Sequence, residues 1–452
     1  MLARVATAAA AFFFIATTSS AQQEPDGFRF HGYLRSGFGV ADDGKPQEAF
    51  KAPNTLAKYR LGNETEAYLE TTFAYGVRPE DDPKTFFDTR ITVSYVTPTS
   101  NTNNFETTTA LREAFVLAQG VWHRQEGATF WAGQRFYDRH DLHMSDFWYR
   151  DLSGFGGGLE GVRVGEKARL AAAWLGGSVN KLTSSGTVPP PGSFQLAKNT
   201  FDLRLYELPF LGGKTQLALD YSAFAGDTLG FPEGSLLVES NSGWAGAVTH
   251  ERPFAAGGRN KLTVEYGTGI AFDFRAVVTP IPGRTFGPGE SVDYDDVWQW
   301  RMVEDLTLDK AGPFTLQLGV LWQELENGAP VGNRLSWYSV GLRPAYYFNR
   351  HFSIELEAGY DHSKVSDGGL SGSLYKVTLA PQITPKVAAL SRPSLRAYVT
   401  WASWSDAFVA WWRRCVSATR PTVSRRASSS RRGGESPPCL REAWLSRSVP
   451  AC

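Results

Sequence analysis

Apolar and polar residues alternate one by one along several stretches of this chain. In HFSIELEAGYD (351–361), apolar residues begin at Phe352 and recur at every second position, with Glu355 and Glu357 between them. FTLQLGVLW (314–322) and SLRAYVTW (394–401) follow the same pattern. Because successive side chains of a β-strand point to opposite faces, this period of two predicts strands with one apolar and one polar face. The chain is therefore predicted to be all-β.

The connections between these stretches are of two kinds. Glycine turns such as Gly257-Gly258 are short, whereas the Pro, Gly and Ser-rich segments 184–193 and 279–291 predict longer loops. Short turns that alternate with long loops, around strands of about ten residues, are typical of outer-membrane β-barrels. A soluble β-sandwich would show the same alternation and remains the alternative at this point.

The two faces of the first predicted strands distinguish these alternatives. In FHGYLRSGFGV (30–40), one face holds Phe30 and Phe38, and the other holds Tyr33 and Arg35. KYRLGNETEAYLETTF (58–73) separates in the same way into an apolar and a charged face. Its apolar face comprises Leu61, Ala67, Leu69 and Phe73, and its polar face comprises Arg60, Glu64, Glu66, Tyr68, Glu70 and Thr72. A lipid-compatible face opposite a charged, aromatic face predicts a transmembrane antiparallel β-barrel with a wet lumen.

The first 21 residues have the composition of a signal peptide. Arg4 precedes an apolar stretch (8–16), and Ser19-Ser20-Ala21 forms a small-residue cleavage site before Gln22. No later apolar run reaches the roughly 18 residues that a transmembrane helix requires. Membrane insertion is therefore expected from strands, within a barrel domain at residues 22–408.

The composition changes abruptly after residue 408. Residues 409–452 contain nine Arg, no Lys, two Glu and all three Cys, whereas residues 1–408 carry 37 basic and 44 acidic side chains. The acidic, cysteine-free body excludes a disulfide or Cys-based metal site there, and no nucleic-acid partner is expected. We interpret 409–452 as the product of a frameshift, with the last strand of the barrel lost or replaced. A basic, disordered extension is the alternative.

The segment RFYDRHDLHMSDFWYRDLSG (135–154) combines charged and aromatic residues without an apolar stripe. Such side chains are too costly to bury unpaired, so they must line water or one another, and flat rings beside hydrogen-bonding groups suit a sugar. The His spacing argues against a metal site, and no helix follows the glycines at 156–161 to form a dinucleotide site. Asp141 and Asp146 could serve a glycosidase, but no apolar pocket for a catalytic acid is evident. We therefore expect no enzyme activity, metal or cofactor.

Several motifs, in order along the chain, resemble those of the maltoporins, the sugar-specific porins of the outer membrane. They are FHGYLRSG, KYRLGNETEAYLE, REA (112–114), WAGQRFYDRHDLHMSDFWYRDLSGFGGGLEGV, VGLRPAYYF and LSRPSLRAYVTWASW, and they cover about residues 28–404. The resemblance implies an eighteen-stranded, homotrimeric barrel in the outer membrane of a Gram-negative bacterium, with a third loop that folds inward. It implies facilitated diffusion of maltose, maltodextrins or related sugars. The alternatives are a general or differently selective porin and, outside the porins, a carbohydrate-active enzyme.

The same resemblance assigns the residues that contact sugar. An aromatic slide is expected at Tyr33, Tyr68, Phe105 and Phe272, of which Phe105 would be lent by a neighbouring subunit. A polar track is expected at Arg35, Arg60, Glu70, Arg112, Arg139, Asp141, His143 and Asp146. Trp148 and Asp151 are expected at the constriction.

Three departures from the family pattern bear on selectivity. Trp148 stands where maltoporins carry a Tyr, and Leu390 stands where they carry a slide Trp before Ser-Arg-Pro. The cysteine pair found in some maltoporin first loops is absent. We therefore expect a sugar channel, and these departures leave its preferred sugar open.

Overall fold

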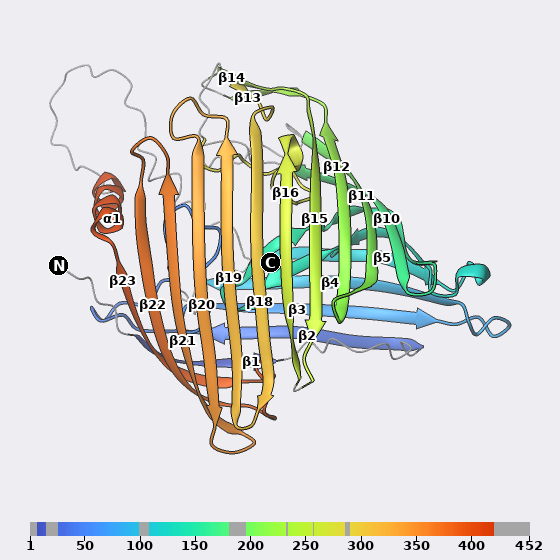
Figure 1. The fold of residues 1–452 in the computed structure, drawn as a ribbon, viewed down its shortest axis with the longest axis horizontal. Helices are drawn as coiled ribbons and strands as arrows, with labels where there is room; N and C mark the ends of the chain where they lie inside the picture. Colours follow the sequence, from blue (N-terminus) through green and yellow to red (C-terminus); the bar gives the residue numbers. More distant parts are fainter. Residues whose placement is uncertain are drawn as a thin grey trace.

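In the computed structural model, the chain folds mainly into one sheet of eighteen strands, β1 and seventeen others that follow residue 26 (Figure 1). Each of the seventeen is antiparallel to the next along the chain. They are β2 (Gly27–Gly37), β3 (Glu66–Val77), β4 (Phe86–Pro98), β5 (Thr108–Gln119), β6 (Thr129–Arg135), β9 (Gly154–Val164), β10 (Ala168–Val179), β11 (Leu196–Phe210), β12 (Gly213–Phe224), β15 (Asn241–Pro253), β16 (Gly258–Thr268), β18 (Val297–Ala311), β19 (Phe314–Asn327), β20 (Arg334–Tyr347), β21 (Phe352–Val365), β22 (Ser371–Ile383) and β23 (Leu395–Trp404).

The structure describes seven parts of the chain. They are residues 7–14, 26–98, 108–179, 196–231, 234–255, 257–284 and 290–419. Phe105, the predicted loop at 184–193, part of the loop at 279–291 and residues 420–452 of the predicted tail lie outside these ranges.

Strand β1 (Thr7–Phe14) closes the ring. It pairs antiparallel with β23, where Thr7 lies opposite Thr400, and with β2, where Phe14 lies opposite Leu34. The predicted all-β barrel is confirmed, and its eighteenth position is occupied by an N-terminal segment, as expected if the last strand is replaced. Residues 7–14 also belong to the predicted signal peptide, whose removal stays a prediction. Without β1, the edges of the sheet are β2 and β23.

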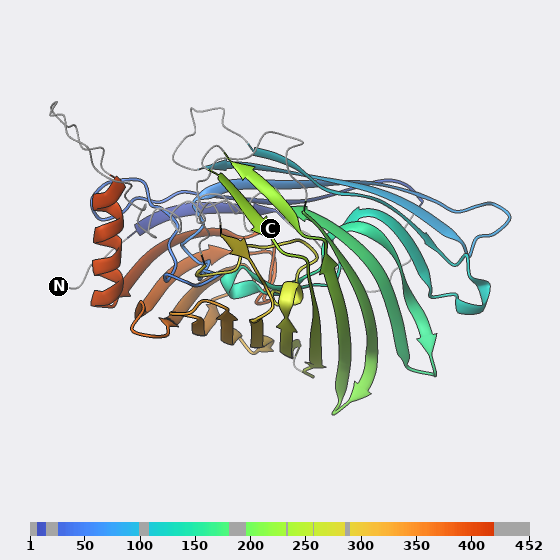
Figure 2. The same cartoon turned by 90° about the horizontal axis from the view of Figure 1, so that it is seen from above.

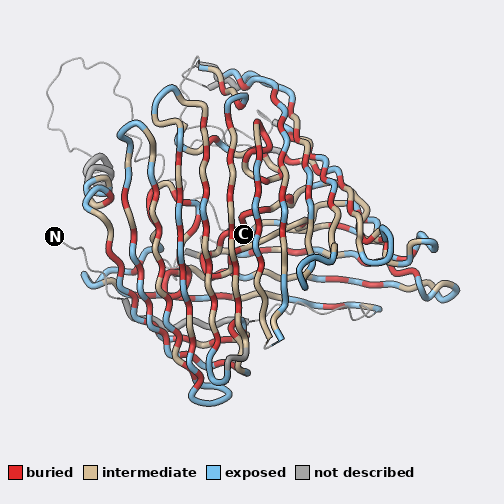
Figure 3. Tube along the Cα trace, in the orientation of Figure 1, coloured by how far each residue is buried: buried red, intermediate tan, exposed pale blue. Residues whose placement is uncertain are grey.

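Burial alternates along the strands as the period of two predicts (Figure 3). On β21, Phe352 and Leu356 are 53% and 39% exposed on the outer face, whereas Glu355 and Glu357 are buried on the inner face. The buried charges are paired: Lys376 Nζ lies 2.6 Å from Glu357 Oε1. Because an unpaired buried charge is strongly unfavourable, such pairing lets the inner face be charged and closely packed.

One strand prediction is wrong in its bounds. Residues 58–73 were expected to form a single strand, but β3 begins at Glu66, and the preceding residues form a loop inside the barrel. Asn63 causes the break, because its side chain donates to the backbone oxygens of Phe50 (2.7 Å) and Tyr59 (3.1 Å) and holds a turn. Leu61, expected to face lipid, instead packs inside the barrel against Ala380 and Tyr398.

The smaller elements lie in the connections. They are β7 (Arg139–Leu142), β8 (Phe147–Asp151), β13 (Asp227–Phe231), β14 (Gly234–Val238), β17 (Ser291–Val292), the 3₁₀ turns η2 (His123–Gln125), η3 (His143–Ser145) and η4 (Gly269–Ala271), and α1 (Asp406–Thr419). Seen from above, the wall of β2–β5 lies opposite the wall of β18–β22, and some of these elements lie between them (Figure 2). Within the described ranges, no helix is both long and apolar enough to cross a membrane.

Candidate functional site

The connection between β6 and β9, residues 136–153, folds into the barrel and is called the inward loop below. Its strands β7 and β8 form a two-stranded antiparallel sheet, with Leu142 opposite Phe147 and η3 at the tip. Leu142, Phe147 and Tyr149 pack against the inner face of the wall, on side chains of β18, β19 and β20. The Phe147 and Trp337 rings meet edge to face at 5.1 Å. This apolar contact holds the loop across the lumen.

The base of the inward loop is held by buried ion pairs. Arg150 is fully buried and donates to both carboxylate oxygens of Asp220, at 2.8 and 3.0 Å, and to Asp138. Arg204 donates to Asp138 at 2.8 Å, and the Tyr137 hydroxyl donates to a carboxylate oxygen of Asp202 at 2.8 Å. These residues pair with one another, as the polar composition of the segment required. They anchor the base of the loop to β11 and β12.

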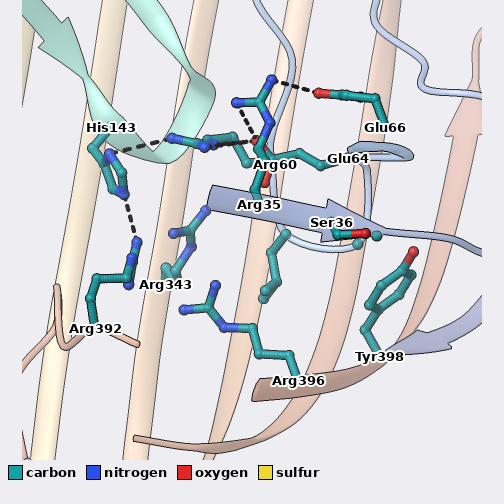
Figure 4. A pocket seen from close by; sticks show the side chains of 13 residues that line it. Arg35, Ser36, Arg60, Glu64, Glu66, His143, Arg343, Arg392, Arg396 and Tyr398 are labelled. Atoms are coloured by element: carbon teal, nitrogen blue, oxygen red, sulfur yellow. Dashed lines mark hydrogen bonds and ion pairs between the residues drawn. The ribbon is translucent and has the colours of Figure 1, made fainter. Parts of the chain in front are cut away.

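The tip of the loop carries Asp146 next to two arginines from other parts of the chain. Asp146 carboxylate oxygens lie 3.6 Å from Arg35 Nη1 and 3.5 Å from Arg60 Nη1. Both arginines also pair with Glu64, and Arg35 pairs with Glu66 at 2.5 Å (Figure 4). A tightly paired guanidinium keeps its orientation, so these groups form a fixed set of donors and acceptors.

A polar cavity of about 30 Å³ lies beside this cluster, which is space for about one or two water molecules. Its lining includes Arg35, Arg60, His143, Arg392 and Arg396, which converge from separate segments of the barrel (Figure 4). Arg392 follows β22 and reaches the tip of the inward loop, where its Nη2 lies 2.9 Å from His143 Nε2. The turn after β22 is thus tied to the loop tip.

His143 is neutral in this environment. Burial lowers the pKa of His143 to about 4, and Arg60 and Arg392 oppose its protonation, although Asp141 favours it. Its Nδ1 lies 3.4 Å from Arg60 Nη1 and 3.6 Å from Asp141 Oδ2, and its Nε2 lies 2.9 Å from Arg392 Nη2. A neutral ring accepts at one nitrogen only, and the shorter distance favours acceptance from Arg392 at Nε2. Burial raises the pKa of Asp141, but its interaction with His143 and nearby cations lowers that pKa to about 2 overall. The tip therefore offers an ionised carboxylate beside a neutral imidazole.

Two tyrosines lie beside the arginines on the opposite wall. The rings of Tyr33 and Tyr68, on β2 and β3, meet edge to face at 5.9 Å, and the Arg35 guanidinium lies 5.0 Å from the Tyr68 ring centre. The Tyr33 hydroxyl accepts from Arg60 Nη2 at 3.0 Å, and the Tyr68 hydroxyl donates to Glu70 at 2.9 Å. The two predicted slide residues therefore contact three of the predicted track residues.

Trp148 lies on the other strand of the loop, stacked on Arg139. The Arg139 guanidinium carbon is 3.7 Å from the Trp148 ring centre and 4.0 Å from that of Phe136, so it lies between two rings. An Asp151 carboxylate oxygen lies 3.4 Å from Arg139 Nε, and the Arg112 guanidinium carbon lies 5.4 Å from the Phe136 ring centre. Cation–π contacts of this kind are worth about 0.5–2 kcal/mol each and fix the ring planes.

A comparison with protein families agrees with this arrangement. The model of the LamB porin family matches residues 28–430. The chain belongs to the LamB porin family. It is therefore a sugar channel of the outer membrane and not an enzyme, and the match continues beyond Trp404, where the motif resemblance ended. Within the described residues, no group of three or more His, Cys, Asp or Glu could hold a metal ion.

Several solved structures resemble this chain at low sequence identity. They include the channel DcaP of Acinetobacter baumannii (9% identity, TM-score 0.41, 89% of this chain and 97% of that chain) and OmpF of Salmonella typhi in complex with daunomycin (8%, 0.42, 89% and 97%). OmpT of Vibrio cholerae is another (9%, 0.37, 89% and 96%).

The structure brings together most of the predicted site residues of this LamB porin. Phe272 is separate from them: it is 1% exposed and packs with Tyr294 and Val297 in an apolar cluster under a long connection. Tyr68 is also buried, at 5% exposed, but it lies against Arg35 and Glu70. A slide role for Phe272 stays a prediction, and it would require the residues packed over its ring to move. Phe105 lies outside the described residues. Leu390, which stands where maltoporins carry a slide Trp, is 43% exposed.

Sequence reasoning missed Phe136 and Arg392. Phe136 was noted only as part of an aromatic segment, yet its ring contacts both Arg112 and Arg139. The sequence offered one signal for Phe136, which is its position beside Tyr137 in the charged and aromatic segment 135–154. Arg392 was noted only within the Ser-Arg-Pro motif, and its contact with His143 spans 249 residues of sequence. Residue spacing carries no signal for such a contact.

Proposed function

We propose that this LamB porin conducts linear gluco-oligosaccharides, maltose and maltodextrins among them, by facilitated diffusion past the tip of the inward loop. The observation that carries the proposal is the contact of Tyr33 and Tyr68 with Arg35, Arg60 and Glu70. A sugar offers C–H faces that stack on flat rings, and hydroxyl groups that exchange hydrogen bonds with fixed charged groups.

The track supplies hydroxyl partners on both sides of the rings. Asp146 Oδ2, Arg35 Nε, Arg112 Nε and Arg139 Nε are buried without a hydrogen-bond partner among the described residues. Because these atoms are shielded from solvent, a sugar hydroxyl or a water molecule reaches them only when the neighbouring side chains shift. Each such contact is weak and repeated along the path, so a ligand can move from one to the next without being trapped.

The constriction determines which sugars pass. Trp148 is stacked on Arg139 and has a larger ring than the Tyr that maltoporins carry at this position. Leu390 leaves a gap in the row of aromatic residues that forms the slide. We therefore expect a preference order among oligosaccharides that differs from that of a maltodextrin-selective channel. We also propose a homotrimer in outer-membrane lipid, with Phe105 reaching a neighbouring subunit.

Current block in planar lipid bilayers tests the proposal. Malto-oligosaccharides of increasing length should reduce the single-channel current reversibly, with affinity that rises with length, because a longer chain spans more contacts. Block by none of these sugars, with free passage of ions, would instead identify a general or differently selective porin.

We further propose that residues 1–21 are removed on export and that residues 409–452 arise from a frameshift. Removal would take β1 from between β2 and β23 and leave two unpaired edges in lipid, at several kcal/mol per unsatisfied group. The chain as written should then assemble poorly. N-terminal sequencing of the exported protein tests whether residues 1–21 are removed. Recovery of a heat-resistant trimer that lacks residues 1–21 would contradict the predicted poor assembly. A gene in which neither other reading frame encodes an aromatic-terminated strand would contradict the frameshift.

A further inference from the structure

Three glycines lie side by side on the inner face of the wall. Gly319 of β19 pairs with Gly341 of β20, which pairs with Gly359 of β21. All three are buried at inward positions of the alternating pattern. None has a positive φ angle, so the backbone itself does not require glycine at these positions. Glycine weakens a strand interior, and it often marks a place where another segment approaches the strand closely.

The space above the row is filled by the inward segments. A Cβ atom at Gly359 would lie 2.5 and 2.6 Å from Cε2 and Cγ of Tyr59. A Cβ at Gly341 would lie 2.9 Å from Tyr59 Cζ and 2.7 Å from Met144 Sδ. At Gly319 the overlap is milder, with Leu142 carbons at 3.0 to 3.4 Å. The Tyr59 ring therefore lies flat on β20 and β21, with the tip of the inward loop beside it.

The residues on this row flank two of the predicted track residues. Tyr59 directly precedes Arg60, and Leu142 and Met144 are the neighbours of His143. The two segments are also joined to each other, because Arg60 N donates to Met144 O at 3.1 Å and Lys58 N donates to Ser145 O at 3.3 Å. The Tyr59 hydroxyl is bonded to Ser339 Oγ at 2.7 Å, which fixes the ring on the wall.

We propose that Gly319, Gly341 and Gly359 form a seat that positions Arg60 and His143 for sugar contact, and that they are specificity-determining positioning residues of this channel. The inference rests on the proposed sugar track. Because well-packed interiors do not absorb an added methyl group without a shift, a side chain in the seat moves Tyr59, and Arg60 with it. The wall strands themselves can remain paired, since the change is on one face only.

The test uses the full chain with residues 1–21 retained, so that β1 stays between β2 and β23, in planar bilayers, with Gly359→Ala as the main variant. The three atoms nearest to its new Cβ all belong to Tyr59, so the overlap has a single partner. We expect the dissociation constant for maltohexaose block to rise roughly tenfold, in line with the cost of overpacking, and the open-channel conductance to change. Gly246→Ala on β15 is the matched control, because its Cβ would meet nothing closer than 3.9 Å, and it should behave as wild type.

Removing the Tyr59 ring distinguishes a seat from a general defect. In Gly359→Ala/Tyr59→Ala, the alanine should add nothing to the effect of Tyr59→Ala alone, because residues in direct contact are not additive. Equal losses from Gly359→Ala with and without the Tyr59 ring would overturn the proposal. If Gly359→Ala does not insert, Gly319→Ala provides the milder overlap and should raise the dissociation constant about two- to fivefold. Block unchanged in both glycine variants would also overturn it.

The conductance measurement separates this inference from the proposed function. If no malto-oligosaccharide blocks the wild-type channel, the sugar track fails. The seat is then still supported if Gly359→Ala, but not Gly246→Ala, changes the conductance and loses that effect in the Tyr59→Ala background. If sugars block the wild type and Gly359→Ala equally, the seat fails and the sugar track stands.

Discussion

The base and the tip of the inward loop are built from the same residue types but are paired differently. At the base, Arg150 and Asp220 are joined at 2.8 and 3.0 Å and are no more than 2% exposed. At the tip, Asp146 lies 3.5 to 3.6 Å from Arg60 and Arg35, and the His143 side chain is 26% exposed. Arg150 and Asp220 satisfy one another through two short hydrogen bonds, whereas Asp146 Oδ2 has an ion-pair partner but no hydrogen bond within the described part of the chain.

The difference assigns separate roles to the two ends. The base fixes the loop across the lumen through buried bidentate pairs, and the tip presents incompletely paired donors and acceptors beside the tyrosines. Changes at the base should therefore alter stability and conductance together. Changes at the tip should alter sugar block and leave the open channel nearly unchanged.

The largest effect is expected from Arg150→Met. It leaves Asp138 and Asp220 buried with less compensation, at a cost of about 3–5 kcal/mol, so the thermal midpoint should fall and the loop should leave the lumen. Single-channel conductance should then rise and fluctuate. Arg163→Met, at an exposed arginine, is the control. A stable channel with wild-type conductance would show that the base does not anchor the loop.

Asp146→Asn tests whether the tip binds sugar, because Asn keeps the size and shape of the Asp side chain and removes its charge. It removes a charged partner of sugar hydroxyls, worth about 1.5–3 kcal/mol, so the affinity of maltohexaose block should fall at least tenfold. The open-channel conductance should change far less than in Arg150→Met. Asp42→Asn, on an exposed connection, should leave block unchanged. A conductance change as large as that of Arg150→Met would remove the distinction between base and tip.

The pH dependence of block tests His143. The pKa of His143 is about 4 in the fold, below its ordinary value of 6.5, so in the folded channel the ring stays neutral down to about pH 5 and becomes protonated as the pH falls through 4. Protonation ends acceptance from Arg392, so block should weaken about two- to fivefold between pH 6.5 and 3, with the midpoint near pH 4. Asp141, with a pKa of about 2, stays ionised over this range. His143→Gln should flatten the dependence, and an equal slope in that variant would assign it to another group.

Trp148→Tyr should have the smallest effect on affinity and the clearest effect on preference. The stack on Arg139 is retained with a smaller ring, so the affinity for any one sugar should change only about twofold. The order in which maltose, sucrose and maltohexaose block the channel should change, because the aperture widens. An unchanged order would place the selectivity filter away from Trp148.

The wall and the loop also differ in how far the sequence could predict them. On β2 and β21 the period of two assigned Arg35, Glu355 and Glu357 to the inner face, because each side chain alternates regardless of its partner. Leu61 does not follow this alternation, because the Asn63 side chain donates hydrogen bonds to two backbone oxygens and holds a turn before β3 begins. No local pattern contained that information.

Within the inward loop, orientation depends on distant partners. Arg139 and Arg150 are equivalent by composition, yet one stacks between Phe136 and Trp148 and the other is buried against Asp220. The family resemblance assigned Arg139 to the track, but only the positions of β11 and β12 explain Arg150. Likewise β1 takes the eighteenth position of the sheet through pairings with β2 and β23, which the composition of residues 7–14 does not encode.

Titration of the single-channel current with maltohexaose, for wild type and Asp146→Asn side by side, tests most directly that the tip of the inward loop binds sugar. We predict saturable, reversible block of the wild-type channel and block at least tenfold weaker in Asp146→Asn, with closely similar open-channel conductance. Equal block of the two channels, or no block of either, would contradict it.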